Sequence, residues 1–457
     1  MSARFFLGAA LVALAAPATA QDFAITSATV ATGDGSEPMQ GATVVVRSGK
    51  VVAAGPGVPV PAGIQAVDGT GKWVTPGLFA ALTTLGLADA GGVQESNDIS
   101  ARGSPFGAAL DVVPALNPAS QHVAVARGKG VTRASVMAQP SGSIFGGQGA
   151  IVDLGADPDM VMRPRAFQMV VLGETGARIA GGSRVSAHAV LRNALREARQ
   201  YGSDSKIAGT RRTGQVTTGD DLPIDTRLID NAAVREDVLL TRFDAAALVP
   251  VVNGAQPLYV NVERAADIRA VLALKGEFPR LRIVIAGASE GWMVARELAA
   301  AGVPVIANAM NDLPASFEQM AATQSNVGRM VRAGVKVAIA PVGGGSGDQP
   351  SNLPQFAGNM VALTKVPGAT GLSWGEAFAA ISSVPADIAG MGGRAGVLKP
   401  GAAGDLVVWD GDPLEVTSAP ERVIIDGVEQ PQDDHQRALA RRYRDLDTSD
   451  LPKAYDR

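Results

Sequence analysis

Residues 76–87 read Pro-Gly-Leu-Phe-Ala-Ala-Leu-Thr-Thr-Leu-Gly-Leu, and this stretch decides the fold. After the Pro76-Gly77 turn comes a nearly continuous apolar run, which is typical of a strand buried on both faces. Before it, from Phe23 to Val74, short β-type runs are broken by turn residues. After it, apolar strands alternate with helical segments, so the stretch joins a β-rich region to a region of strand–helix units.

The strand–helix rhythm is clearest in the second half of the chain. The predicted strands are Pro257–Glu263, Leu281–Gly287, Val303–Ala309 and Val335–Pro341. The predicted helices are Ala265–Glu277, Glu290–Ala301 and Ala315–Arg332. Repeated units of this kind over about 300 residues favour a (β/α)8 barrel, with a doubly wound parallel sheet as the alternative.

Two hairpin-like stretches lie at opposite ends of the chain. Ala42–Arg47 and Val51–Ala54 flank a Ser-Gly-Lys turn, and Gly404–Asp410 and Arg422–Gly427 form the second pair. Periodicity alone allows two separate β units as readily as one small sandwich built from both ends.

The composition excludes several classes of function. A net charge of −4 and a pI near 5.6 leave no basic surface of the kind that binds nucleic acid. The chain contains no cysteine, so it has neither disulfides nor a cysteine nucleophile. Apolar residues make up 46% and charged residues 18%, which predicts a well-buried core.

The first twenty residues have the features of an export signal. Arg4 precedes the apolar run Phe5–Ala16, and Ala18-Thr19-Ala20 provides a small-residue cleavage site. We therefore expect a mature protein that begins near Gln21 and is periplasmic or secreted. An uncleaved membrane anchor is the alternative, but the run is short for a membrane span.

Segments at both ends resemble imidazolonepropionase-type amidohydrolases of the exported kind. The similar segments are Gly41–Val46, Gly49–Val51, Gly71–Leu78, Ser141–Leu154, Leu172–Glu174 and Gly396–Leu414. The resemblance implies a (β/α)8 barrel with a small composite β-sandwich formed by both termini. It divides the chain into a signal peptide (1–20), sandwich (21–77), barrel (78–395), sandwich (396–430) and charged tail (431–457). It also implies hydrolysis of non-peptide or cyclic C–N bonds with one or two divalent metals such as zinc.

The metal ligands that this resemblance implies are missing from the chain. The two histidines of the first barrel strand fall on Leu82 and Thr84, and a nearby aspartate falls on Ala80. The remaining family ligands fall on Asn261, on Ala286 and on Pro341 or Val342. A bridging lysine is expected near Gln168–Val171, yet no lysine occurs from Val131 to Ser205. Zinc-like ions take histidine, cysteine or carboxylate, so we predict a degenerate metal centre without a bound cofactor.

The histidines elsewhere offer no replacement for these ligands. His122 and His188 lie in predicted helices and His435 lies in the charged tail, whereas a catalytic zinc needs three converging ligands. Residues at the strand ends are the candidates for lining a pocket. They are Leu82, Thr84, Glu174, Asn261, Glu263, Ser289, Glu290, Asn308, Asp312 and Asp348. Glu263 and Glu290 could form a metal-free acid–base pair, although carboxylates that simply open the following helices are the simpler explanation.

Three further stretches depart from the repeating pattern. Two glycine runs, Ser143–Gly149 and Gly343–Gly347, suggest flexible active-site loops more than phosphate loops, because neither ends in Gly-Lys-Ser/Thr. Tyr201–Leu228 is polar and predicts a long surface loop that is a candidate lid. The charged end, Gln430–Arg457, predicts a solvated tail with a helix over Asp434–Leu446.

Three hypotheses about function follow. The first is a non-catalytic protein of this fold that binds a small molecule or supports an active amidohydrolase. In this hypothesis it forms a homo-oligomer or pairs with the active enzyme. The second is a working hydrolase of amide or cyclic-amide bonds with a metal-free site. The third is a scaffold protein in which the barrel mouth is filled. None of them involves nucleic acid, or a membrane once the signal has been cleaved.

Overall fold

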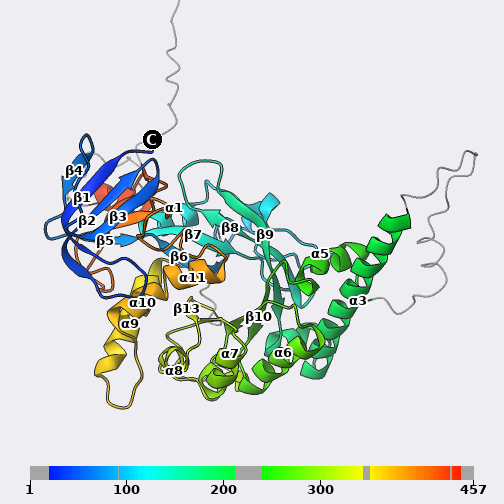
Figure 1. Ribbon diagram of the computed structural model, residues 1–457. Helices are drawn as coiled ribbons and strands as arrows, with labels where there is room; N and C mark the ends of the chain where they lie inside the picture. The colour runs from blue at the N-terminus through cyan, green and yellow to red at the C-terminus, as the bar shows by residue number, and fades with distance from the viewer. Residues whose placement is uncertain (1–19, 91, 212–238, 343–349, 433–434, 444–457) are drawn as a thin grey trace, which may run out of the picture.

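The computed structural model describes residues 20–90, 92–211, 239–342, 350–432 and 435–443 (Figure 1). One of its sheets combines strands from both ends of the chain. Its strands are β1 Phe23–Val30, β2 Met39–Arg47, β3 Lys50–Pro56, β4 Gln65–Asp68, β5 Trp73–Pro76, β14 Leu406–Trp409, β15 Pro420–Ile425 and β16 Val428–Glu429. The order is β16-β15-β14-β5-β1-β2-β3, with β4 paired to β1. Strand β14 is antiparallel to both β5 and β15, so the two ends of the chain form one sheet.

The second sheet is shaped like a nearly closed barrel. Its strands are β6 Leu78–Thr83, β7 Val131–Val136, β8 Phe145–Asp153, β9 Val161–Val171, β10 Leu258–Val262, β11 Ile283–Gly287, β12 Val305–Ala307 and β13 Val337–Ile339. They are hydrogen-bonded in this order. Between the edge strands lies the Ala380-Ile381 segment, which accepts backbone hydrogen bonds from Ile339 on β13 (2.9 Å) and from Phe79 on β6 (3.0 Å).

The barrel-shaped sheet is mixed, and this corrects the expectation of regular strand–helix units. Strand β8 runs antiparallel to both β7 and β9. It contains all three glycines of the run Ser143–Gly149, so the flexible loop that the sequence predicts there is in fact a strand. Gly149 faces the ring of Phe167 so closely that a β-carbon would collide with it, which explains why glycine stands in this strand. The second glycine run, Gly343–Gly347, lies outside the described residues.

Helices cover the outer face of the barrel-shaped sheet, with α3, α5, α6, α7 and α8 along one side (Figure 1). The helices are α1 Gln121–Gly128, α2 Gly173–Ile179, α3 Arg184–Arg211, α5 Arg242–Val252, α6 Ala265–Glu277, α7 Ala295–Ala300, α8 Asn326–Arg332, α9 Leu353–Ala362, α10 Trp374–Ala379, α11 Ser383–Ile388 and α12 His435–Arg442. Side chains on the barrel strands alternate between an inner and an outer apolar cluster. On β10, Tyr259 belongs to the inner cluster and Val260 to the outer one.

Two expectations about these helices are wrong. Helix α3 continues through Tyr201 to Arg211, so the first part of the predicted surface loop is helical, and its remainder from residue 212 lies outside the described residues. The helix predicted over Ala315–Arg332 is formed only from Asn326 onward, as α8. The preceding residues instead make polar contacts with other loops, as described below. Within the described ranges, no helix has the length and apolar character needed to cross a bilayer.

A buried cluster of charges joins the two sheets. Arg133 on β7 donates from Nε and Nη2 to the Asp405 carboxylate, at 2.7 and 2.9 Å, and from Nη2 to Asp426 at 2.7 Å. Asp153 on β8 lies 3.8 Å from the same guanidinium. Arg133 and Asp405 are almost completely buried, so the cluster holds the terminal sheet against the barrel with paired charges.

Candidate functional site

Apolar residues occupy three of the positions where metal ligands were expected. Leu82, Ala286 and Val342 are buried members of a single apolar cluster. In the same cluster the rings of Phe167 and Tyr259 stack with centroids 4.3 Å apart. All three side chains are hydrocarbon and none offers a metal-binding atom.

Two polar side chains border this apolar cluster. Thr84 follows β6 and is buried. Asn261 on β10 is half-buried and donates from Nδ2 to the backbone oxygen of Ala286 at 3.4 Å. This amide therefore helps to hold two neighbouring strands together. It does not replace the histidine that a zinc site would need at this position.

Glu263 and Glu290 hold the loops after β10 and β11 together. Glu263 accepts hydrogen bonds at Oε2 from the Ser289 backbone N–H (2.9 Å) and from Ser289 Oγ (2.7 Å). Glu290 in turn accepts at Oε2 from the N–H of Ala265, the first residue of α6, at 2.9 Å. Each carboxylate therefore satisfies backbone groups of the other loop, and Glu290 stabilises the start of α6 instead of a helix that follows it.

Glu263 is a buried carboxyl group with a raised pKa at this end of the barrel. Burial raises its pKa, the hydrogen bonds from Ser289 lower it, and the charge of Glu318 raises it again, with a net upward shift. A carboxyl group with a raised pKa that lies 2.7 Å from a serine hydroxyl can accept a proton from it. No third group completes a catalytic set among the contacts described for this pair.

The loop after β12 crosses the carboxyl ends of the neighbouring strands; we call residues 308–325 the strap. Near its start, Asn311 Nδ2 donates to Ser289 Oγ at 3.0 Å. In its middle, Glu318 Oε2 accepts from the N–H of Glu174 at 2.6 Å and from Arg184 Nη2 at 3.2 Å. The strap thus extends from β12 across to the segment that follows β9.

Arg184 is the centre of a charge cluster beside the strap. Its guanidinium lies 3.6 Å from Glu174, 3.2 Å from Asp267 and 3.2 Å from Glu318. Of these residues the sequence pointed only to Glu174. Glu318 was missed because it fell inside a predicted helix, and Arg184 and Asp267 were missed because neither follows a strand. Gly173 is the available signal, since its φ of +64° favours glycine and a β-carbon there would displace the Glu318 carboxylate.

The other predicted pocket residues lie away from this cluster or outside the described residues. Asn308 donates from Nδ2 to the Val342 backbone oxygen at 3.1 Å, near the inner apolar cluster. Asp312 is exposed and accepts from the Gln324 N–H at 3.4 Å. Asp348 lies outside the described residues.

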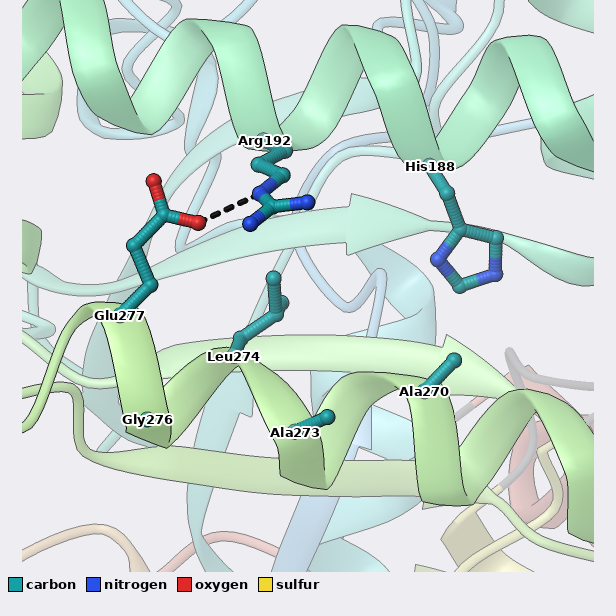
Figure 2. A pocket seen from close by; sticks show the side chains of 7 residues that line it. All are labelled: His188, Arg192, Ala270, Ala273, Leu274, Gly276 and Glu277. Atoms are coloured by element: carbon teal, nitrogen blue, oxygen red, sulfur yellow. Dashed lines mark hydrogen bonds and ion pairs between the residues drawn. The ribbon is translucent and has the colours of Figure 1, made fainter.

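A groove between α3 and α6 contains a histidine, but it lies outside the barrel (Figure 2). It has a volume of about 560 Å3 and is lined by His188, Arg192, Ala270, Ala273, Leu274, Gly276 and Glu277. Burial lowers the pKa of His188, and the nearby Asp267 only partly offsets this effect. Arg192 and Glu277 form an ion pair at the other end of the groove. Throughout the described ranges, no three His, Cys, Asp or Glu side chains are grouped so that they could hold a metal ion.

Comparison with known protein families finds a match in the second half of the chain. Residues 282–431, about a third of the chain, match the amidohydrolase family. This stretch contains an amidohydrolase-family domain. It extends from β11 to the end of the terminal sheet and includes the position of Ala286.

Individual proteins support the same fold. The chain superimposes with a TM-score of 0.74 on an amidohydrolase from Thermotoga maritima MSB8, at 23% identity over 89% of this chain and 99% of that one. A prolidase complexed with N-methylphosphonate-L-proline gives a TM-score of 0.51 at 17% identity, over 90% of this chain and 100% of that one. The amidohydrolase TasK of Hapsidospora irregularis is 49% identical over 63 residues, which span 14% of this chain and 6% of that protein. The structural matches show a shared fold, and the sequence match covers too little of TasK to carry over its activity.

Proposed function

We propose that the whole chain is an exported amidohydrolase-superfamily protein, with a barrel and a composite β-sandwich, that no longer performs metal-dependent hydrolysis. In this proposal it binds a small molecule without catalysis or supports an active amidohydrolase. The export signal proposed for residues 1–20 rests on their sequence.

The observation that carries this proposal is the composition of the inner apolar cluster. Leu82, Ala286 and Val342 are all buried in it, and the family resemblance calls for metal ligands at Leu82, at Ala286 and at Pro341 or Val342. Restoring one ligand would leave the others absent, because a catalytic zinc needs three protein ligands and an open position. A polar group placed there alone would be buried without partners, which is costly. The interior is therefore suited to packing rather than to holding a metal.

Elemental analysis combined with an activity assay tests this proposal. The chain from Gln21 onward is expressed, analysed for zinc and manganese, and assayed on N-acyl amino acids, dipeptides and lactams. We expect substoichiometric metal and no turnover that depends on metal. Stoichiometric zinc or manganese, with activity that is lost on chelation, would refute the proposal.

A second candidate function is metal-free hydrolysis, and the contact between Glu263 and Ser289 favours it. The 2.7 Å contact places a buried carboxylate within reach of the Ser289 hydroxyl proton. If this pair is catalytic, Glu263→Gln and Ser289→Ala each abolish a chelator-resistant activity. Glu297→Gln is the matched control, because Glu297 on α7 is exposed and pairs only with Arg269 among the ion pairs described, and it leaves that activity unchanged. Absence of activity with all three classes of substrate leaves the first proposal as the one supported.

A further inference from the structure

We infer that the strap, residues 308–325, is a pH-responsive cover over the carboxyl ends of β9, β10 and β11, which closes on acidification and opens as the pH rises. The inference concerns the conformation of the protein itself and does not rest on the proposed function.

The strap is attached to the barrel mainly through polar contacts. Glu318 Oε2 binds the Glu174 N–H at 2.6 Å and Arg184 at 3.2 Å. Near the C-terminal end of the strap, the N–H of Ala321 donates to Glu290 Oε1 at 3.3 Å, and Trp292 Nε1 donates to the Ala321 oxygen at 2.9 Å. Because these contacts involve side chains from several different loops, releasing the strap requires no rearrangement of the barrel strands.

Several large apolar side chains of the strap are not buried. The exposed fraction is 79% for Leu313, 87% for Phe317 and 62% for Met320. By contrast, Glu263 under the strap is only 3% exposed. Segments with few buried apolar contacts are those that open at the lowest free-energy cost. The strap therefore covers a buried carboxyl group while its own polar contacts hold it in place.

Negative charges outnumber positive ones around Glu318. The charged groups that interact with it are Glu174 on α2, Arg184 on α3, Glu263 at the end of β10 and Arg264 at the start of α6. Behind them, Asp267 on α6 pairs with Arg184, and His188 on α3 lies 4.0 Å from Asp267. Arg184 is shared among three carboxylates, and Arg264 pairs with Asp267 at 2.8 Å. Closing the strap thus brings the Glu318 carboxylate toward other carboxylates that are only partly neutralised.

The direction of the pH response follows from the pKa of Glu318. In the closed state burial and the charge of Glu174 raise this pKa, and the hydrogen bond from Glu174 and the charge of Arg184 only partly offset them. Opening the strap returns the group to water, where the ordinary value of about 4.5 applies. The closed state therefore binds a proton more tightly than the open state. Lowering the pH toward that ordinary value favours closure, and raising it above the closed-state pKa favours opening.

Amide hydrogen exchange read by mass spectrometry tests this inference on the full chain. Peptides covering residues 308–325 and 172–176 are compared with a β10 peptide, residues 258–262, between about pH 5 and about pH 8, after correction for intrinsic exchange rates. We expect protection of the strap peptides to fall as the pH rises, by up to about tenfold for each unit of pKa difference. The β10 peptide should show no matching change. Strap protection that is constant or that rises with pH would overturn the inference.

Two variants identify the group responsible. Glu318→Gln keeps an acceptor for the Glu174 N–H and removes the charge, so strap protection should become independent of pH. Glu277→Gln is the matched control, because Glu277 pairs with Arg192 and Arg196 on the outer side of α3 and α6. It should retain the wild-type response. If Glu318→Gln does not fold, Glu174→Gln replaces it and should weaken the response; an unchanged response in a folded variant would refute the role of this carboxylate cluster.

Discussion

Asp153 links the protonation of a single side chain to the stability of the protein. Burial raises its pKa from 3.8 to about 6, although the hydrogen bond from Gly155 and the charge of Arg133 oppose the shift. Because the pKa is higher in the folded state, the folded protein binds this proton more tightly. The contribution of Asp153 to the free energy of unfolding therefore grows as the pH falls from about 6 to 3.8. It is lost again as the pH rises through about 6.

We expect Asp153→Asn to remove this pH dependence and to raise the free energy of unfolding above pH 7 by about 1–2 kcal/mol. Asparagine keeps an oxygen for the Gly155 N–H, so the turn is preserved. Urea unfolding at a series of pH values measures the effect. Asp159→Asn, an exposed position in the same turn, is the control and should leave the profile unchanged. A variant less stable than the wild type at high pH would contradict the prediction.

Gln168 on β9 provides a second test at the residue scale. Its side chain is fully buried, and neither amide atom has a hydrogen-bond partner among the described residues. An unpaired buried amide opposes folding, so Gln168→Met should raise the free energy of unfolding by about 1 kcal/mol. Gln256→Met is the contrasting variant, because Gln256 donates to the Arg165 oxygen at 2.8 Å and its loss should destabilise. Equal destabilisation by both changes would show that Gln168 has a favourable role.

Asp244 shows how one residue can hold a whole element, helix α5, in place. Thr241 caps this helix by accepting from the Asp244 N–H at 3.1 Å. The buried Asp244 carboxylate also accepts from the N–H groups of Gly107 and Ala109, at 3.0 and 2.8 Å. Asp244→Ala should therefore cost about 2–4 kcal/mol in unfolding free energy, because buried backbone donors lose a charged acceptor.

The control for this prediction is Thr241→Ala, which removes the cap but leaves the contacts of Asp244 with the distant loop. It should cost about 1 kcal/mol. Chemical unfolding measures both variants. If the two changes cost the same, the loop contacts of Asp244 contribute nothing and the prediction fails.

Helices and strands could be predicted from the sequence where the local residue pattern determines them. They could not be predicted where contacts with distant parts of the chain determine them. Helix α6 spans Ala265–Glu277, the range predicted for it from the alternation of strands and helices. The helix predicted over Ala315–Arg332 fails before Asn326, because Glu318 and Ala321 bind partners in other loops instead. The apolar residues at the positions that the family resemblance assigns to metal ligands could be read directly from the sequence. The hydrogen bond between Glu290 and the Ala265 N–H could not be predicted from the sequence, because it depends on how two loops approach each other in space.

At the scale of the whole molecule, the Arg133 cluster joins parts that are far apart in sequence. Arg133 and Asp405 are separated by 272 positions, so no local pattern indicates their contact. The pairing of the two ends, by contrast, was anticipated from the resemblance of the terminal segments. Arg133 belongs to the barrel-shaped sheet, whereas Asp405 and Asp426 belong to the terminal sheet region, so its replacement tests how strongly these parts depend on each other.

We expect Arg133→Met to lower the free energy of unfolding by about 3–5 kcal/mol, because it leaves the buried Asp405 carboxylate without a positive charge to neutralise it. Arg165→Met is the matched control: Arg165 pairs with Asp111 at 2.7 Å, but its side chain is 66% exposed, and the loss should stay below about 1 kcal/mol. Adding Asp405→Asn to Arg133→Met removes an orphaned charge and should recover part of the stability. Thermal and urea unfolding of the three variants measure these differences. If the double variant is no more stable than Arg133→Met alone, the guanidinium stabilises the contact between the sheets through packing rather than by neutralising Asp405.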